Sequence, residues 1–190
     1  MTNFENTVID LVNRIAQAPV IEVCCGSGWL IQGLTCPNAI GVDPMAPADP
    51  RFQRLYFSQF MFTAPELWDA AQTIIMCYPP GPADAYTVGL EVIEAMYPGQ
   101  RLLLIAPKPY EETTVAGTYS MWQKVFSDTI LVDEHQIDDC HRLYVLEPGN
   151  GIQQDTRKAI LKGHDLWQLN GIRYDRYGMP IPADIPTRKA

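Results

Sequence analysis

The sequence has few of the residues that build metal sites and disulfide frameworks. Its 190 residues include three histidines and five cysteines, and no two cysteines stand in a CxxC pair. An odd number of irregularly spaced cysteines is typical of neither a zinc site nor a set of disulfides. We therefore expect no metal, and a reducing, cytoplasmic environment fits this cysteine pattern best.

Long apolar runs are also missing. No stretch approaches the roughly 20 apolar residues that a membrane-spanning helix needs. The opening residues, MTNFENTVID, lack the basic region followed by an apolar core that is typical of a secretory signal. The expectation is a protein without a membrane partner, with enough chain in one main domain for a substantial core.

Positive charge is scarce and unevenly distributed. The formal net charge is −8; residues 1–150 hold 7 Lys+Arg and 18 Asp+Glu, a net −11, whereas residues 151–190 hold 7 and 4, a net +3. The overall charge argues against a broad nucleic-acid surface, but a basic segment beside an acidic body can act as a binding arm. The alternatives are a solvated tail and a tail docked on the body by charge.

What the sequence does contain is a regular alternation of predicted strands and helices. Apolar residues at helical spacing predict a helix over 4–16, with Thr2 and Glu5 as its capping box. Asp84 is expected to cap a longer helix that continues to Tyr97. Strands are predicted at 20–25, 39–43, 54–59, 73–78, 101–107, 129–137 and 141–148, and further helices at GSGWLIQGL, from Thr63 to about Gln72 and at 117–127.

This alternation predicts an α/β fold. Strands that alternate with helices form a parallel sheet with helices on both faces, here a Rossmann-like three-layer sandwich. The last two predicted strands are close enough for a hairpin, which gives about seven strands and an antiparallel edge. Residues 1–150 would form this domain. Residues 151–190 would form an extension. It would be either an extended tail or a short helix plus a hairpin at Asn170-Gly171, a pair suited to a type I′ turn.

The stretch VIEVCCGSG at 20–28 places a carboxylate in an apolar strand directly before a glycine-rich turn. Such a turn lets the backbone approach a ligand closely, and ligands of parallel sheets bind at the carboxyl ends of strands, near the point where strand order reverses. Asp43 ends the next strand and can accept both hydroxyls of a ribose. Glu22 can face an ammonium group, directly or through water. One ligand that carries both groups is S-adenosylmethionine.

The order of these motifs resembles that of the class I S-adenosylmethionine-dependent methyltransferases from residue 20 to about 148. IEVCCGSG resembles their first motif, with Cys24 where the family usually has its first glycine, and GVDP resembles the second. For the third motif, Ser58 and Gln59 are the candidates near the adenine. The resemblance implies S-adenosylmethionine as cofactor, with these binding residues: Glu22, Cys24, Gly26, Ser27, Gly28, Asp43, Ser58 and Gln59.

The fourth motif of the family would be CYPPGP, at the end of a predicted strand. YPPG resembles the motif of nucleic-acid amino-methylating enzymes in which an acid or amide, two prolines and an aromatic residue orient the target amine. Tyr78 replaces the acid or amide, and a tyrosine can donate, accept or stack. Tyr78, Pro79 and Pro80 are therefore the candidate catalytic residues; the alternative is that the prolines only end a strand.

Two functions stay open from the sequence. The first is a methyltransferase acting on an amino nitrogen of a small molecule, or of a nucleic acid held by tail residues such as Trp167, Arg173 and Tyr174. The second is a catalytically inactive member of the same fold that acts through cofactor or protein binding, in keeping with Cys24 and Tyr78. A nucleotide-binding oxidoreductase is disfavoured because the third glycine of the dinucleotide motif is missing.

Overall fold

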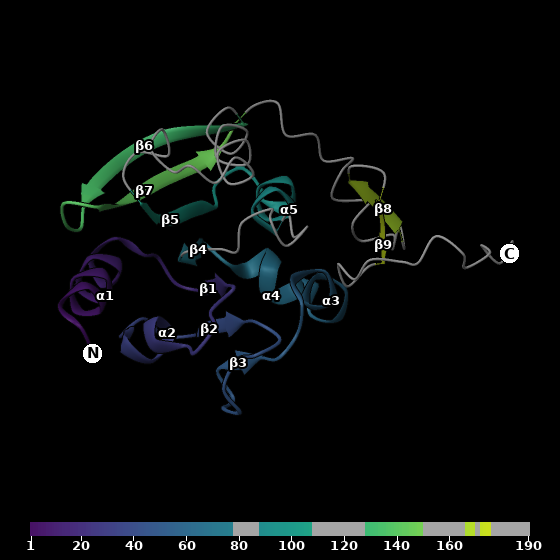
Figure 1. Ribbon diagram of the computed structural model, residues 1–190, viewed down its shortest axis with the longest axis horizontal. Helices are drawn as coiled ribbons and strands as arrows, with labels where there is room; N and C mark the ends of the chain where they lie inside the picture. The colour runs from purple at the N-terminus through teal and green to yellow at the C-terminus, as the bar shows by residue number, and fades with distance from the viewer. Residues whose placement is uncertain (78–87, 108–127, 150–165, 170–171, 176–190) are drawn as a thin grey trace, which may run out of the picture.

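The computed structural model describes residues 1–77, 88–107, 128–149, 166–169 and 172–175 (Figure 1). One twisted sheet runs through the main body, with helices against both of its faces. This layered arrangement puts the strand ends, rather than the sheet faces, within reach of a ligand.

The sheet contains seven strands in the order β3-β2-β1-β4-β5-β7-β6. The first five are parallel, and the last two form a hairpin in which β7 pairs antiparallel with β5. The predicted mostly parallel sandwich with an antiparallel edge is therefore confirmed. The strands are β1 (Val20–Val23), β2 (Ala39–Val42), β3 (Phe52–Gln53), β4 (Thr73–Cys77), β5 (Arg101–Pro107), β6 (Thr129–Gln136) and β7 (His141–Pro148).

Helix α1 (Asn3–Ile15) begins at the predicted capping box. The Glu5 N–H donates to Thr2 Oγ1 at 3.2 Å, and the Thr2 N–H donates to Glu5 Oε2 at 2.6 Å. These two bonds satisfy backbone donors that the first turn leaves without helical partners. The helix α2 (Trp29–Gly33) follows the glycine-rich turn directly.

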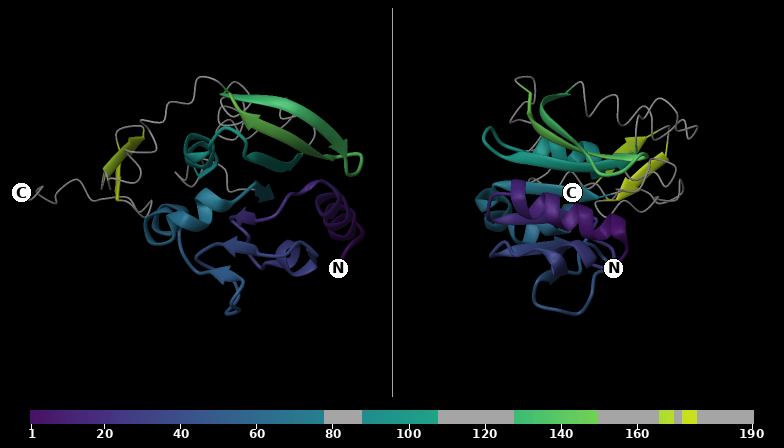
Figure 2. Two further views of the ribbon diagram at one scale, coloured as in Figure 1. Left: turned by 180° about the vertical axis from the view of Figure 1, so that it is seen from behind. Right: turned by 90° about the vertical axis from the view of Figure 1, so that its left-hand side faces the viewer.

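An apolar core lies on each face of the sheet, and the helices can be followed from behind and after a 90° turn in Figure 2. Helices α1 and α2 cover the face that presents Val20 and Ile75, and three later helices cover the face that presents Ile21 and Ile74. Burial on both faces explains why these strands are apolar at nearly every position. The later helices are α3 (Phe57–Thr63), α4 (Pro65–Ala70) and α5 (Val88–Ala95).

The strand predicted at 54–59 is wrong. The third strand is the two-residue β3, and helix α3 begins at Phe57. Phe57, Phe60 and Met61 are all buried. Their i, i+3, i+4 spacing matches one face of a helix, and this periodicity outweighs the strand propensity of the preceding aromatic residues.

Other boundaries differ less. The helix expected from Thr63 begins at Pro65, whose fixed φ suits a first helical position. Helix α5 is described from Val88, so its predicted cap at Asp84 lies outside the described residues, as does the helix predicted at 117–127. Among the residues that the structure describes, no helix is both long and apolar enough to cross a membrane.

Strand β6 forms the outer edge of the large sheet. Ile130, Leu131 and Val132 on it are 46–50% exposed. Its register with β7 shifts between Leu131 and Asp133, which leaves Val132 without a partner in the ladder. Such a shift is a β-bulge, which bends the strand locally.

The tail contains a second, separate sheet of two antiparallel strands, β8 (Leu166–Leu169) and β9 (Ile172–Asp175). This pairing agrees with the hairpin predicted from Asn170-Gly171, although those two residues lie outside the described part of the chain. The division into a domain at 1–150 and an extension at 151–190 stays a prediction.

Candidate functional site

The chain reverses its direction of winding between β1 and β4, and the candidate site lies at the carboxyl ends of these strands. From β1 the sheet continues through β2 to β3 on one side and through β4 to β5 on the other. A crevice forms outside the strand ends at such a point, because the following loops leave in opposite directions. The predicted residues Glu22 to Gly28 and Asp43 all come from this place in the sheet.

The turn after β1 is held to β2 by backbone hydrogen bonds. The N–H groups of Cys24 and Cys25 both donate to the Val42 carbonyl, at 2.9 and 3.4 Å, and the Gly28 N–H donates to the Cys25 carbonyl at 2.8 Å. The φ angles are +62° at Cys24, +51° at Gly26 and +73° at Gly28. All three therefore occupy the left-handed region, which favours glycine.

The two glycines of this turn serve different purposes. A Cβ on Gly26 would meet no described heavy atom within 4 Å, so this part of the turn presents its backbone to open space. A Cβ on Gly28 would lie 2.4 Å from the Phe52 ring. At Gly28 the missing Cβ therefore makes room for Phe52, and the binding part predicted for Gly28 stays a prediction. Ser27, between them, is exposed.

Asp43 ties the turn to the end of β2. Its Oδ2 accepts a hydrogen bond from the Gly26 N–H at 3.2 Å, and its Oδ1 accepts one from the Met45 N–H at 2.7 Å. Each carboxylate oxygen has lone pairs for a further donor. The sequence did not single out Met45. This residue is 80% exposed, so the N–H that contacts Asp43 carries an apolar side chain at the surface.

Glu22 lies in the middle of the sheet, in register with Gly41 of β2 and Ile75 of β4. It is 2% exposed, and its Oε2 has no hydrogen-bond partner among the described residues. Burial raises the pKa of this carboxyl to about 8; the Ile31 N–H opposes the shift and nearby Asp43 adds to it. A buried polar atom without a partner is costly, and such atoms in native proteins call for an explanation.

Three thiols lie in the same electrostatic environment. Burial, reinforced by Asp43 and Glu22, raises the pKa of Cys24 to about 12, and burial with Glu22 raises that of Cys77 to about 12. The pKa of Cys25 is also raised, by burial and by the same two carboxyls. Cys25 is buried, whereas Cys24 is half-buried.

These thiols should resist alkylation in the folded protein. The thiolate is the reactive species. Iodoacetamide is therefore expected to label Cys140, which is exposed in the β6–β7 turn, well before Cys24, Cys25 or Cys77. Peptide mass spectrometry over a time course measures the order. Early labelling of Cys25 in folded protein would contradict the described packing, and a urea-unfolded sample provides the reference in which all five react.

The backbone at Cys24 gives a second test. At ordinary positions alanine is more stabilising than glycine by roughly 0.5–1 kcal/mol, but a left-handed φ penalises any Cβ by roughly 1–2 kcal/mol. Cys24→Gly should therefore be more stable than Cys24→Ala by about 1 kcal/mol, measured by urea unfolding. Both variants lose the thiol, so their difference isolates the backbone effect. Equal stabilities would mean that residue 24 does not hold its left-handed conformation in solution.

Ser58 and Gln59 occupy the first turn of α3 rather than a strand end. The Gln59 side chain is used locally, since its Oε1 accepts a hydrogen bond from the Tyr56 N–H at 3.0 Å. A part for either residue near an adenine stays a prediction. Tyr78, Pro79 and Pro80 follow β4 directly but lie outside the described residues.

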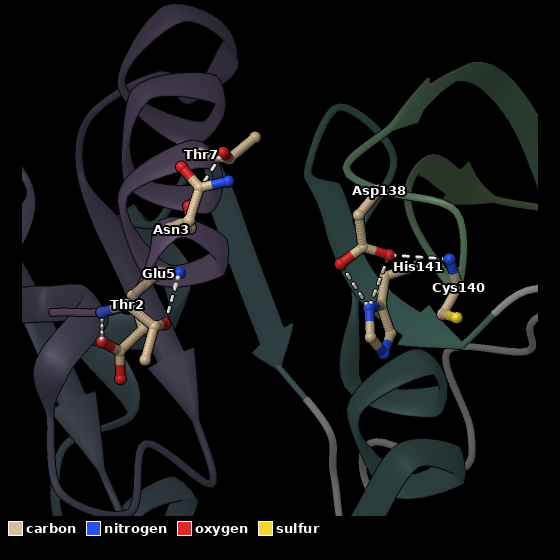
Figure 3. A network of polar contacts seen from close by, with 7 residues as sticks. All are labelled: Thr2, Asn3, Glu5, Thr7, Asp138, Cys140 and His141. Atoms are coloured by element: carbon tan, nitrogen blue, oxygen red, sulfur yellow. Dashed lines mark hydrogen bonds and ion pairs between the residues drawn. The ribbon is translucent and has the colours of Figure 1, made fainter.

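A cluster of rings at the same edge was missed by sequence reasoning. Phe4 lies 5.0 Å from the His141 ring in edge contact and 6.4 Å from the ring of Trp29, which begins α2. Asp138 holds His141 Nδ1 at 2.8 Å and accepts from the Cys140 N–H at 2.7 Å (Figure 3). The signal was the Asp-x-x-His spacing across the predicted hairpin turn.

Within the described ranges, no group of three or more His, Cys, Asp or Glu side chains could hold a metal ion.

The sequence matches no protein-family profile, and no curated protein matches it. Solved structures do match. A crystal structure of an S-adenosylmethionine-dependent methyltransferase from Clostridium acetobutylicum ATCC 824 has a TM-score of 0.52 and 10% identity, over 78% of this chain and 92% of that one. The structure of N,N-8-amino-8-demethyl-D-riboflavin dimethyltransferase from Streptomyces davawensis has a TM-score of 0.45 and 16% identity, over 76% and 53%.

The first of these similarities extends over nearly the whole of the solved chain. In this protein the same arrangement consists of five parallel strands closed by the antiparallel β6–β7 hairpin. The chain therefore has the fold of the class I S-adenosylmethionine-dependent methyltransferases.

Proposed function

We propose that this protein binds S-adenosylmethionine at the carboxyl ends of β1 and β2 and methylates an amino nitrogen of a nucleic acid or a small molecule. One observation carries the proposal: the buried Oε2 of Glu22 has no partner among the described residues, next to a glycine turn that is open at Gly26. A ligand ammonium group, directly or through water, would supply the missing donor. The methyltransferase fold supports this interpretation.

Asp43 would hold the ribose. Two hydroxyls can donate to its two oxygens, while the Gly26 and Met45 N–H groups keep the carboxylate in place. The exposed side chain of Met45 offers an apolar surface for the adjoining part of the nucleoside. Gly26 would let the ligand lie against the backbone, since no Cβ stands in the way.

The chemistry required of the protein beyond binding is modest. S-Adenosylmethionine supplies a methyl group on a sulfonium sulfur, which a nitrogen lone pair can accept. The chain has to position that nitrogen in line and exclude water. Tyr78, Pro79 and Pro80, which follow β4 in the sequence, are the residues that we propose for orienting the amine. The resemblance of YPPG to motifs of amino-methylating enzymes supports this assignment.

The basic tail would distinguish the two classes of acceptor. For a nucleic acid, Arg173, Arg176 and neighbouring aromatic residues such as Trp167 would supply charge and stacking. The acidic body, at −11 over residues 1–150, would then face away from the phosphates. For a small molecule, the tail would take no part in acceptor binding.

A second candidate function is a binding protein that has this fold without catalysis. The observation that favours it is Cys24, which adopts a left-handed φ of +62° where the family usually has glycine. Its half-buried side chain adds volume to a turn that otherwise presents backbone. In this case a protein partner, rather than a methyl acceptor, would be the physiological ligand.

Calorimetric titration with S-adenosylmethionine and, separately, S-adenosylhomocysteine tests the binding step. We expect saturable binding at one site per chain. Transfer of a labelled methyl group to a panel of oligonucleotides and small amines then tests catalysis. Binding without transfer to any acceptor would favour the second candidate, and no binding to the folded protein would overturn the proposed function.

A further inference from the structure

The carboxyl of Glu22 has an unusual surrounding for an acid in a ligand site. It stands between two parallel strands, beside Gly41 and Ile75, and 2% of the residue is exposed. The Ile31 N–H of α2 donates to it, while its Oε2 lacks a partner among the described residues. One backbone donor is too little to stabilise a full negative charge at this depth.

The charges near Glu22 have the wrong sign to help. The groups with which it interacts electrostatically are Asp43 at the end of β2, Cys24 and Cys25 in the turn, and Cys77 of β4. None of these can carry a positive charge. From α1, the residues buried on this face of the sheet are apolar: Val8, Ile9, Leu11 and Val12. The described residues around Glu22 therefore supply no cation, so a ligand would have to provide one.

We propose that Glu22 is a proton-exchange site: it is protonated in the empty protein and gives up its proton when a ligand ammonium group binds. This inference rests on the proposed function, because the ligand is taken to carry an ammonium next to a nucleoside. In the step, the O–H bond of the Glu22 carboxyl breaks and the proton passes to solvent. The resulting carboxylate pairs with the ammonium, so the charge buried with Glu22 is balanced by the ligand.

The proton exchange makes ligand choice depend on pH. A ligand with an ammonium group must displace a proton, so its affinity rises as pH increases towards about 8, the pKa of Glu22 in the empty site. The limiting slope is about tenfold for each pH unit, since one proton is released per ligand. A nucleoside thioether without the amino-acid group, such as 5′-methylthioadenosine, displaces no proton there. Its affinity should not follow this slope.

Calorimetry in buffers with different heats of ionisation counts the released protons. At about pH 7 we expect close to one proton for each S-adenosylhomocysteine bound by the unaltered protein. The isosteric Glu22→Gln variant cannot ionise, so its proton count should fall by about one; comparing the two also removes the titration of the ligand's own amine. 5′-Methylthioadenosine should release none. Equal proton counts in the two proteins would overturn the inference while leaving cofactor binding intact.

A measurement without ligand separates this inference from the proposed function. Carbon-13 NMR of labelled glutamate carboxyls, assigned with Glu22→Gln, reports the charge of Glu22 in the empty protein. We expect a protonated carboxyl at about pH 7 that ionises only as the pH rises towards about 8. An ionised Glu22 would overturn the exchange whether or not any ligand binds. If it is protonated but S-adenosylhomocysteine does not bind, the ligand assignment is wrong, and with it the proposed exchange.

Discussion

Replacing Glu22 with glutamine should remove a steep loss of stability between mildly acidic and mildly alkaline pH. The folded protein keeps this carboxyl protonated up to about pH 8, whereas the ordinary value is 4.5. Between these values unfolding releases a proton, so stability falls as pH rises. The contribution is fully present below 4.5 and is lost as pH passes through about 8. The slope is roughly 1.4 kcal/mol for each pH unit.

The expected difference is large for a single side chain. From about pH 5.5 to about pH 7.5, the unaltered protein should lose roughly 2–3 kcal/mol more stability than Glu22→Gln, which corresponds to about 5–10 °C in melting temperature. Urea unfolding at several pH values measures it. Glu66→Gln, at an exposed position, is the matched control and should leave the slope unchanged. Parallel pH profiles for Glu22→Gln and the unaltered protein would show that Glu22 is already ionised when folded.

Asp43→Ala should weaken binding of S-adenosylhomocysteine by about ten- to a hundredfold. Hydrogen bonds to a charged group contribute roughly 1.5–3 kcal/mol, and the substitution removes the two oxygens proposed to hold the ribose. It also leaves the Gly26 and Met45 N–H groups without their acceptor, which loosens the turn. Both consequences act in the same direction. Isothermal titration gives the affinity, and circular dichroism verifies the fold.

The control for Asp43→Ala is Asp49→Ala, which removes the same charge from the loop that follows β2. Asp49 pairs with Arg51 at 3.2 Å and makes no described contact with the glycine turn. Its substitution should change affinity less than twofold. An Asp43→Ala protein that is folded and binds as tightly as Asp49→Ala would exclude Asp43 from the ribose site.

The order of the large elements could be predicted from the sequence because the pattern is local. Apolar runs bounded by glycine and proline mark β1, β2, β4 and β5, and the Thr2–Glu5 box marks the start of α1. The prediction of a strand at 54–59 was wrong for a physical reason. The hexamer contains aromatic residues, which favour strands. Burial of Phe57, Phe60 and Met61 on one side stabilises a helix instead, and this burial depends on tertiary packing that the local sequence does not contain.

The candidate site could be located from the sequence but not resolved in detail. The acid, glycine turn and second acid, Glu22 to Asp43, come together as expected. Gly26 and Gly28 differ because the Phe52 side chain of β3 packs against Gly28 and not against Gly26. Similarly, the orphaned Oε2 of Glu22 reflects the register of three strands. Information of this kind is absent from the spacing of residues along the chain.

The exposed side of β6 has a consequence for solubility. Among the described strands, β6 has a neighbour on one side only. An edge strand is a template for another chain, and three successive apolar side chains at Ile130–Val132 strengthen that attraction. The register shift at Val132 interrupts the row of donors and acceptors within this apolar segment. Asp133 and Glu134 follow at once and add charged side chains to this edge, which disfavours pairing with another strand. The β-bulge in β6 thus disfavours edge-to-edge association between copies of this protein.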